Sequence, residues 1–286
     1  MDLSIITVSW NVKDILRENL KSIFQSSQNI SFEVFVVDNN SEDGSAEMVR
    51  EEFPQVKLIT NSENLGFAKA NNQAIKQSQG RYVLLYNPDT KCFKDTFEKM
   101  VKWMDEHKDV GVGGCRLIKE DGSDFQHVRR YPKLSDQLAV VLKLPHIFPN
   151  ILNKYLRVDF DYNKEAKVDS IRGSFFMIRR EVIDKIGGLD ELYFIWFEEV
   201  DYCRQVKNAG FKVTYTPVAK CVDLKGKSFD QVPRGKAQEY FRDSMLKYFK
   251  KWHPSWQYYI LKMAWPVGSL MVKVGEKAKV KSEAKT

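Results

Sequence analysis

Short apolar runs alternate with longer amphipathic segments along the first third of the chain. Runs rich in β-branched and aromatic residues predict strands at Leu3–Ser9, Phe32–Val37, Val56–Thr60 and Tyr82–Tyr86. Between these runs, apolar residues recur at helical spacing, which predicts helices over residues 11–24, 46–53 and 67–79. This alternation indicates an α/β fold with a mostly parallel central sheet, because each helix must carry the chain back across the sheet to begin the next strand.

The rest of the chain has a less regular pattern. It predicts helices at Phe93–His107 and Gln238–Trp252, a hairpin over Cys115–His127, and strands at Asp169–Ile178 and Lys212–Thr216. Pro217 is expected to end the last strand, because proline cannot donate to a strand ladder, and Asp223 would then lie in a polar loop. Asn11 is expected to be the N-cap of the first helix.

The most apolar strand, Tyr82–Tyr86, is followed by Asn87-Pro88-Asp89-Thr90. Since Pro88 cannot continue the ladder, Asp89 is delivered to the carboxyl end of the strand. Ligands bind at that edge of open α/β sheets, and a carboxylate there can hold a divalent cation against a polyphosphate. On these residues alone, an ordinary turn with Asp89 capping the next helix is an equally good interpretation. Asp38 ends its strand in a similar way.

Three acidic residues, Glu198, Glu199 and Asp201, follow an aromatic run at a predicted helix start. Acidic residues are common in a first helical turn, and pairing of Glu198 and Asp201 with Arg204 would explain them without a catalytic role. The aromatic neighbours favour a second interpretation. Apolar surroundings raise the pKa of a carboxylate and make it a better proton acceptor near neutral pH.

The net charge of +7 is concentrated at one end of the 286-residue chain. Residues from Lys236 onward account for the excess, so the remainder is near neutral and no nucleic-acid partner is expected. Tryptophans such as Trp252 and Trp256 are interleaved with these lysines, which suits a peripheral site on an anionic membrane surface. The alternative to membrane binding is that the aromatic residues of the C-terminal helix pack on the rest of the protein. Lys273–Lys285 is too polar to pack in this way.

Cysteine usage and missing motifs further limit which class of protein this sequence can encode. Four widely separated cysteines without a zinc-type spacing indicate reduced thiols, and no leader or membrane-spanning run is visible, so we expect a cytoplasmic protein at the inner face of the plasma membrane. Neither a G-x-G-x-x-G motif after the first strand nor a P-loop occurs, which argues against dinucleotide and P-loop chemistry.

An ordered set of motifs resembles the family 2 glycosyltransferases, and most closely their bacterial rhamnosyltransferase-like branch. The motifs are Thr7-Val8-Ser9-Trp10-Asn11, Val37-Asp38-Asn39-Asn40-Ser41, Asn64-Leu65-Gly66-Phe67-Ala68-Lys69-Ala70-Asn71-Asn72, Asn87-Pro88-Asp89-Thr90, Gly187-Gly188-Leu189-Asp190 and Phe197-Glu198-Glu199-Val200-Asp201. The resemblance implies a GT-A domain over residues 1–235, followed over 236–286 by C-terminal amphipathic helices and a basic tail. It also implies inverting transfer from a nucleotide-diphosphate sugar, with Mg²⁺ or Mn²⁺. We expect a glycan or lipid-linked acceptor in polysaccharide biosynthesis, because the basic aromatic tail would hold the enzyme at the membrane, where such acceptors lie.

The resemblance also implies roles for single residues. Asp38 would bind the nucleotide base, Asp89 and Asp223 the metal ion, and Glu199 would be the general base, with Glu198 beside it as the second catalytic candidate. The implied donor-binding set is Val8, Asn11, Asp38, Asn40, Asn64, Gly66, Asn71 and Asn87.

Two positions depart from the family pattern. Glu199 stands where the family usually has aspartate, and Asp223 stands where many relatives have a metal-binding histidine. A carboxylate is a harder ligand than imidazole and suits Mg²⁺ or Mn²⁺. These departures leave open a sugar-nucleotide-binding protein without transferase activity. A nucleotidyltransferase is disfavoured, because Ser9-Trp10-Asn11-Val12 lacks a glycine-rich basic loop.

Overall fold

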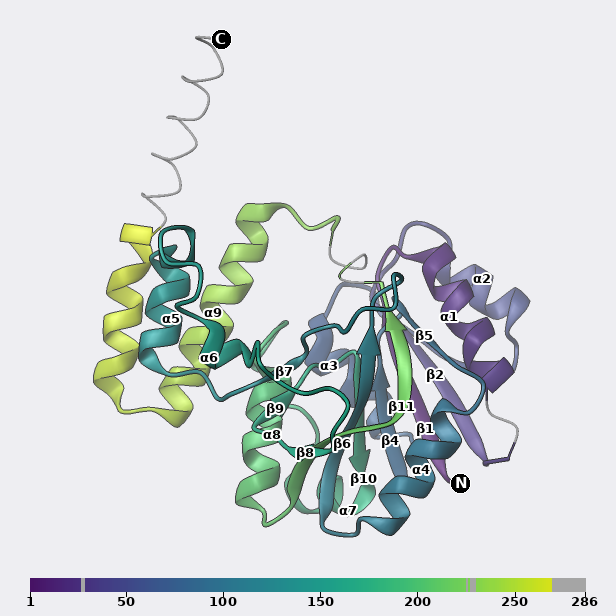
Figure 1. The fold of residues 1–286 in the computed structure, drawn as a ribbon. Helices are drawn as coiled ribbons and strands as arrows, with labels where there is room; N and C mark the ends of the chain where they lie inside the picture. Colours follow the sequence, from purple (N-terminus) through teal and green to yellow (C-terminus); the bar gives the residue numbers. More distant parts are fainter. Residues whose placement is uncertain (27–28, 225, 227–229, 269–286) are drawn as a thin grey trace.

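A central β-sheet with helices on both faces forms the body of the protein, and a helical cluster lies at one side (Figure 1). The computed structural model describes residues 1–26, 29–224, 226 and 230–268, and the account below concerns these residues. The strands of the main sheet follow the order β3-β2-β1-β4-β10-β6-β11-β5, with β8 paired to β11 outside this path. Their bounds are β1 Leu3–Ser9, β2 Phe32–Asp38, β3 Lys57–Thr60, β4 Tyr82–Tyr86, β5 Thr90–Cys92, β6 Val110–Ile118, β8 Ala166–Lys167, β10 Phe175–Arg179 and β11 Lys212–Asp223.

Strands β1 to β4 are parallel, as the sequence predicts, and their helices cover both faces of the sheet. The helices of the body are α1 Lys13–Ser26, α2 Ser45–Glu52, α3 Gly66–Ile75, α4 Thr96–Glu106, α7 Arg180–Ile186 and α8 Glu198–Asn208. Helices α1, α2 and α4 pack on one face, and α3, α7 and α8 on the other. Side chains of β4 therefore alternate between two cores, with Leu84 in the first and Leu85 in the second.

The second half of the sheet is mixed. Strand β10 runs antiparallel to both β4 and β6, and β5 runs antiparallel to β11. The predicted strand end at Pro217 is wrong, because β11 continues to Asp223. The pairing of β11 with β6 shifts register between Tyr215 and Lys220, and this irregularity accommodates a residue that has no N–H to donate.

Two other local predictions also need correction. Asn11 does not cap the first helix: α1 begins at Lys13, and the Asn11 side-chain oxygen accepts a hydrogen bond from the Glu42 N–H instead. The predicted hairpin is short, because β6 bonds back to Asp124 through a single bridge. Beyond it, β7 (Val128–Arg129) pairs with β9 (Ser170–Ile171) in a separate small sheet.

The helical cluster at the side of the sheet has a core of its own. It contains α5 Leu134–Val141, η1 Leu144–His146, α6 Asn153–Leu156, α9 Arg234–Trp252 and a helical segment over residues 255–268. Tyr248 and Phe249 of α9 are buried here with Leu261 and with Phe197 of the body. Helix α9 is continuous across the predicted domain boundary at residue 235.

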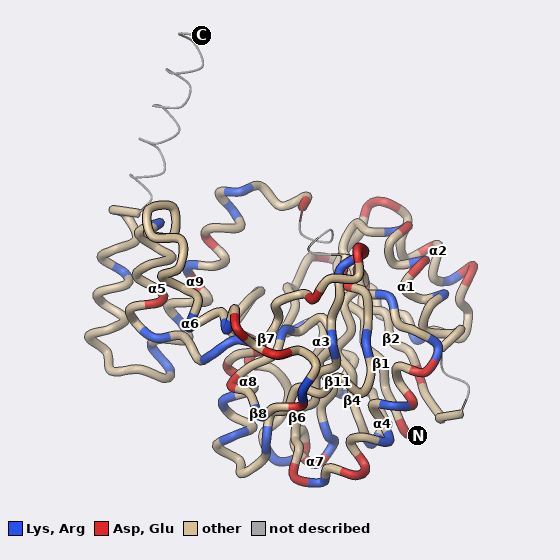
Figure 2. Tube along the Cα trace, viewed as in Figure 1, with Lys and Arg blue, Asp and Glu red and all other residues tan. Residues whose placement is uncertain are grey.

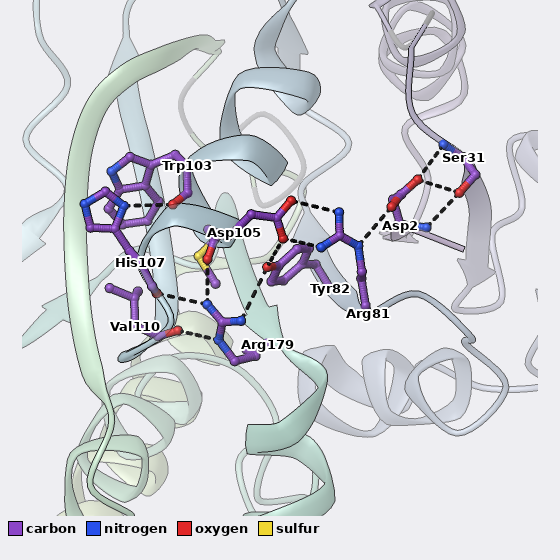
Figure 3. A network of polar contacts seen from close by, with 10 residues as sticks. Asp2, Ser31, Arg81, Tyr82, Trp103, Asp105, His107, Val110 and Arg179 are labelled. Atoms are coloured by element: carbon purple, nitrogen blue, oxygen red, sulfur yellow. Dashed lines mark hydrogen bonds and ion pairs between the residues drawn. The ribbon is translucent and has the colours of Figure 1, made fainter.

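Polar contacts fix the amino ends of the parallel strands (Figure 3). Arg179, at the end of antiparallel β10, donates hydrogen bonds to the carbonyls of Met104, His107 and Val110. Arg81, just before β4, pairs with Asp2 and Asp105. Asp38, the last residue of β2, and Asp89, just after β4, lie at the opposite, carboxyl edge, where ligands bind in open α/β sheets.

Candidate functional site

Asp89 and Asp223 are neighbours at the carboxyl edge of the sheet. Strand β5 pairs with β11 so that Thr90 lies opposite Asp223, and the Leu224 N–H donates to the Asp89 carbonyl at 2.9 Å. Both aspartates are 1% exposed. The sequence Asn87-Pro88-Asp89-Thr90 does form a turn, closed by a 3.2 Å hydrogen bond from the Thr90 N–H to the Asn87 carbonyl. Capping of a following helix by Asp89 is wrong, however, because β5 follows the turn.

The Asp89 turn is held by a side chain from α1. The amide of Asn19, which is fully buried, donates to the carbonyls of Asn87 at 3.0 Å and Thr90 at 2.7 Å. On the other side, the Asn87 N–H donates to the Ser174 carbonyl at 3.2 Å. The backbone around Asp89 is therefore fixed from two elements before any ligand binds.

The donor chemistry of Asp89 and Asp223 suits a hard divalent cation. Carboxylate oxygens are the ligands that Mg²⁺ and Mn²⁺ prefer, and Mg²⁺ is commonly held by one or two carboxylates together with substrate phosphates. Among the described residues, no group of three or more His, Cys, Asp or Glu side chains could hold a metal ion by itself. The two aspartates thus fit an ion that takes its other ligands from a bound diphosphate and water.

Glu198 and Glu199 lie in the first turn of α8 and line a cavity of about 200 Å³, the carboxylate cavity. Burial raises the pKa of both carboxyl groups. The charge of Glu199 raises the pKa of Glu198 further, whereas Arg129 and Arg172 act in the opposite direction on Glu199. The pKa of Glu198 is therefore raised more strongly than that of Glu199, which favours Glu198 as the protonated member of the pair and Glu199 as the base.

The backbone before the two glutamates is strained. Trp196 and Phe197 both adopt the left-handed region, with φ of 65° and 68°. Such conformations cost energy for non-glycine residues and persist where surrounding contacts impose them. Here the Phe67 N–H donates to the Phe194 carbonyl at 2.7 Å, and the Ser244 hydroxyl donates to the Ile195 carbonyl at 2.8 Å. Helices α3 and α9 thus determine where the acid pair lies.

Asp201, the third acidic residue, has a different environment. It is fully buried and accepts hydrogen bonds from Gln205, Lys251 and Trp252 at 2.6, 2.9 and 2.5 Å. The expected pairing with Arg204 is replaced by an ion pair with Lys251 of α9. Asp201 therefore attaches the helical cluster to α8, while Glu198 and Glu199 face the cavity.

A second cavity of about 260 Å³, the α3 cavity, adjoins the first. It is lined by Val8, Asn64 and Gly66 from the predicted donor-binding set, and Phe67 and Ile195 line both cavities. Gly66 has φ of 80°, and a Cβ there would lie 2.4 Å from the Phe194 carbonyl. Only glycine allows this close approach of α3 to the segment that leads to Glu198.

Helix α9 supplies residues of the α3 cavity that sequence reasoning missed. Lys236 and Tyr240 line it, and the Tyr240 ring stacks on Phe194 with centroids 4.3 Å apart. Trp10, within the turn that the resemblance assigns to the nucleoside pocket, and Asn39, which has no predicted role, also line the α3 cavity. The pattern around Tyr240 predicts a helix but contains no signal that this helix reaches the sheet edge.

The other predicted donor-binding residues lie around the two cavities. Asn87 lines the carboxylate cavity, whereas Asp38, Asn11, Asn40 and Asn71 line neither. Asp38 is buried at the end of β2 and accepts from the Ser41 N–H at 3.0 Å. The Asn71 amide donates to the Phe67 carbonyl within α3. Lys225 and Lys227, for which the sequence favours a solvated lysine loop over phosphate contacts, lie outside the described residues.

His127 is a buried residue of the carboxylate cavity that no motif indicates. Its Nδ1 lies 2.7 Å from the Phe125 carbonyl, which can only accept, so Nδ1 carries the proton. Burial lowers the pKa of His127 to about 4, so the ring is neutral at pH 7 and Nε2 is an acceptor. With Arg129 and Arg172, the cavity offers both acceptors and cationic donors to a polyhydroxylated ligand.

Comparison with known proteins agrees with these observations. Residues 4–187 match the sequence profile of glycosyl transferase family 2. An N-acetylglucosaminyl-diphospho-decaprenol L-rhamnosyltransferase of Mycobacterium tuberculosis is 25% identical over 81% of this chain and 78% of its own length. The rhamnosyltransferase WbbL of Escherichia coli is 22% identical over 74% of this chain and 80% of its own length.

Solved structures share the fold at lower identity. The mannosyltransferase PcManGT of Pyrobaculum calidifontis, in complex with GDP-Man and Mn²⁺, has a TM-score of 0.60 at 19% identity, covering 99% of this chain and 79% of its own. Staphylococcus aureus TarS 1-349, in complex with UDP-GlcNAc, has a TM-score of 0.55 at 18% identity, covering 87% of this chain and 67% of its own. The GT-A fold expected from the motifs is confirmed.

Proposed function

Because the chain belongs to glycosyl transferase family 2 and is a glycosyltransferase, we propose that it moves a sugar, with inversion, from a nucleotide-diphosphate sugar to a hydroxyl of a lipid-linked glycan acceptor in cell-surface polysaccharide synthesis. The relatives act in such pathways: one is a rhamnosyltransferase on a diphospho-decaprenol acceptor, and another is a putative teichuronic acid biosynthesis glycosyltransferase.

One observation carries the proposal more than any other. The α3 cavity and the carboxylate cavity share Phe67 and Ile195, so they adjoin each other at the carboxyl edge of the sheet. The α3 cavity has an aromatic and amide lining that suits a nucleoside, and the carboxylate cavity has carboxylates and cationic donors that suit a sugar. A sugar nucleotide placed along them has its sugar beside Glu199.

In the proposed reaction Glu199 takes the proton of the acceptor hydroxyl. The acceptor oxygen attacks C1 of the donor sugar as the bond between C1 and the diphosphate oxygen breaks, and the electron pair of that bond stays on the diphosphate. A single displacement of this kind inverts the configuration at C1. Glu198 keeps its proton, and Arg129 and Arg172 hold the Glu199 charge, so the base is ionised when the acceptor arrives.

A divalent cation, Mg²⁺ or Mn²⁺, would be held by Asp89 and Asp223 and would supply charge neutralisation to the leaving diphosphate. The chain's own contribution is to hold these two carboxylates next to each other. The pairing of β5 with β11 brings them together, and Asn19 fixes the turn that carries Asp89. This assignment depends on the hard donor set at Asp89 and Asp223, and it makes donor binding depend on the cation.

We place the enzyme on the cytoplasmic surface of a membrane. Among residues that the structure describes, no helix has the length and apolar character to cross a bilayer. The segment 255–268 instead carries exposed apolar side chains on one side, including Trp256, Tyr259 and Met263. Lys and Arg are frequent along α9 beside it (Figure 2), and this combination suits an anionic interface.

A panel of nucleotide sugars, screened by thermal shift with and without Mn²⁺, identifies the donor. With that donor, the wild-type protein is expected to transfer sugar to a short-chain lipid-diphosphate glycan, and Glu199→Gln is expected to lose at least about 100-fold in rate while still binding donor. Donor binding by the wild type without transfer to any acceptor would instead support a sugar-nucleotide-binding protein. Full activity of Glu199→Gln would exclude Glu199 as the base.

A further inference from the structure

A third cavity, the aromatic cavity, adjoins the carboxylate cavity at Glu199 and shares no lining residue with the α3 cavity. It has a volume of about 230 Å³ and is lined by Arg129, Tyr155, Trp196, Phe197 and Phe241 together with Glu199. The carboxylate and aromatic cavities share Arg129, Trp196 and Glu199, whereas the α3 cavity shares none of these three. The proposed base therefore lies on the wall between the central space and this outer one.

The lining of the aromatic cavity comes from four separate elements. Arg129 belongs to β7, Tyr155 to α6 and Phe241 to α9, and Trp196 lies in the strained turn before α8. Trp196 and Phe241 meet edge to face with ring centroids 6.2 Å apart. Phe241 also contacts Phe197, with centroids 5.6 Å apart. These contacts hold the rings in place, so the cavity is formed before a ligand binds.

Arg129 is the cationic residue of this cavity, and backbone contacts hold Arg129 at the edge of the cavity. The small sheet pairs Arg129 with Ser170, and the neighbouring Arg130 N–H donates to the Tyr155 carbonyl at 3.0 Å. Arg129, Tyr155 and Glu199 line the same cavity, and the guanidinium lowers the pKa of Tyr155 and Glu199 against the effect of burial. Its side chain is otherwise exposed and accessible to a ligand.

We propose that the aromatic cavity is the acceptor subsite: its rings pack against one pyranose ring of the acceptor, and Arg129 binds a phosphate or diphosphate group attached to that sugar. This inference rests on the proposed function and adds the residues that recognise the acceptor. An aromatic wall suits the C–H-bearing face of a pyranose, and a cavity of this volume accommodates one ring. A guanidinium forms bidentate hydrogen bonds with phosphate oxygens, so a sugar on a phosphate ester is selected over a neutral glycoside.

The location of the subsite agrees with the chemistry of transfer. A sugar in the aromatic cavity has its hydroxyls beside Glu199, which also lines the cavity proposed for the donor sugar. Inversion requires the acceptor oxygen to attack C1 from the face opposite to the leaving diphosphate, and a separate acceptor cavity allows this approach. Arg129 lines both cavities, whereas Arg172 lines the carboxylate cavity and not the aromatic cavity, so of the two arginines Arg129 reaches the acceptor subsite.

Binding of two acceptor probes to the full chain tests the proposal without requiring turnover. The probes carry the same N-acetylglucosamine ring, one as a decyl diphosphate ester and the other as an uncharged octyl glycoside, and their affinities are measured by isothermal titration calorimetry. We expect the wild type to bind the diphosphate probe more tightly. Arg129→Gln should weaken the affinity for the diphosphate probe by roughly 10- to 100-fold and leave the affinity for the glycoside unchanged, because only the charged hydrogen bonds are lost.

Two further variants separate the parts of the proposal. Arg130→Gln is the matched control: Arg130 is exposed, adjoins Arg129 and lines neither the carboxylate nor the aromatic cavity, so both affinities should be unchanged. Phe241→Leu should weaken both probes by a similar factor, of roughly 5- to 10-fold, because it removes a ring that contacts the sugar. The melting temperature and donor affinity of each variant confirm that it is folded.

Several results would overturn the subsite. If Arg129→Gln weakens the affinity for both probes equally, Arg129 does not bind the phosphate. If it weakens donor affinity and leaves both probe affinities unchanged, Arg129 binds the donor. Unchanged affinities in Phe241→Leu would remove the aromatic wall. If the probes bind as expected but no donor supports transfer, the proposed function fails while the subsite stands, so the two failures are distinguishable.

Discussion

The carboxylate of Asp201 accepts a hydrogen bond of 2.5 Å from the indole of Trp252, and this contact joins α8 to the end of α9. Lys251 adds an ion pair at 2.9 Å to the same fully buried carboxylate. The two attachments hold α9 against the body, and α9 in turn supplies Tyr240 to the α3 cavity and Phe241 to the aromatic cavity. The helical cluster is therefore part of the candidate site.

Removal of the Asp201 carboxylate should strongly destabilise the protein. Asp201→Ala leaves the Trp252 N–H without its acceptor and leaves Lys251 paired with Asp190 alone, and breaking one side of a buried pair typically costs about 3 kcal/mol or more. Asp243→Ala, which removes a surface ion pair with Arg242, is the control and should change stability by less than about 0.5 kcal/mol. Chemical denaturation measures both. Similar small effects of the two substitutions would show that Asp201 does not anchor α9.

Local patterns in the sequence were sufficient for the part of the site that follows the parallel strands. The apolar run of β4 and the proline after it place Asp89 at a strand end, and the aromatic run before α8 places Glu198 and Glu199 in apolar surroundings. Both features are encoded within a few residues, because strand ends and helix starts depend on neighbouring side chains and backbone. Asn87, two residues before Asp89, lines the carboxylate cavity with Glu198 and Glu199, which agrees with the general rule that ligands bind at this edge.

Contacts between distant segments account for what the sequence did not predict. Asp223 belongs to β11 because β6 and β5 both pair with that strand beyond Pro217, and no local signal reveals a partner strand. The role of Asp201 depends on Lys251 and Trp252, which are fifty residues away. Tyr240 reaches the α3 cavity only because α9 docks where it does. Tertiary packing of this kind overrides local propensity.

Glu198 should make the stability of the protein depend on pH. Burial raises the pKa of its carboxyl group well above the usual range, and the charge of Glu199 raises it further. An acid whose pKa is raised in the folded state stabilises the protein below its unfolded pKa, and this contribution is lost as the pH rises through the folded value. Glu198→Gln has no proton to lose, so its melting temperature should exceed that of the wild type by more at pH 8 than at pH 5.

The difference in melting temperature between Glu198→Gln and the wild type, measured as a function of pH, tests this prediction. Melting temperatures of both proteins across pH 5 to 8 should diverge steadily, with the wild type losing stability toward the alkaline end. Glu42→Gln, at an exposed position near the sheet edge, is the control and should follow the wild-type profile. Parallel profiles for Glu198→Gln and wild type would mean that Glu198 is ionised throughout this range and is not the protonated member of the pair.

Asp89 and Asp223 should both be needed for the cation to strengthen donor binding. With the nucleotide sugar found in the panel, Mn²⁺ should increase the thermal shift of the wild type. Asp89→Asn and Asp223→Asn should each weaken the apparent affinity for Mn²⁺ by roughly 10-fold or more, because a neutral amide replaces an anionic ligand. Asp121→Asn, in an exposed turn, is the control. Retention of the full Mn²⁺ effect in Asp89→Asn would place the cation elsewhere.

The apolar face of residues 255–268 should attach the enzyme to anionic membranes. Trp256, Tyr259, Met263 and Val267 recur every three or four residues on its exposed side, whereas Leu261 is buried toward the helical cluster. Seven Lys and Arg against two Asp and Glu between residues 234 and 268 add attraction to anionic lipids, each cation contributing about 1 kcal/mol near the surface. The expected lysine-rich anchor, Lys273–Lys285, lies outside the described residues and is tested in the same assay.

Sedimentation with phosphatidylglycerol-containing vesicles measures this attachment. Met263, 76% exposed, is the most accessible residue of the face, so Met263→Glu should reduce the bound fraction sharply by placing a charge where the bilayer would be. Val218→Glu, an apolar-to-acid change on the exposed side of β11, should bind as the wild type does. Truncation after Gly268 should weaken binding and reduce its salt dependence, because five lysines are lost. Equal binding of Met263→Glu and wild type would show that this helix does not touch the membrane, and equal binding of the truncated chain would exclude the tail.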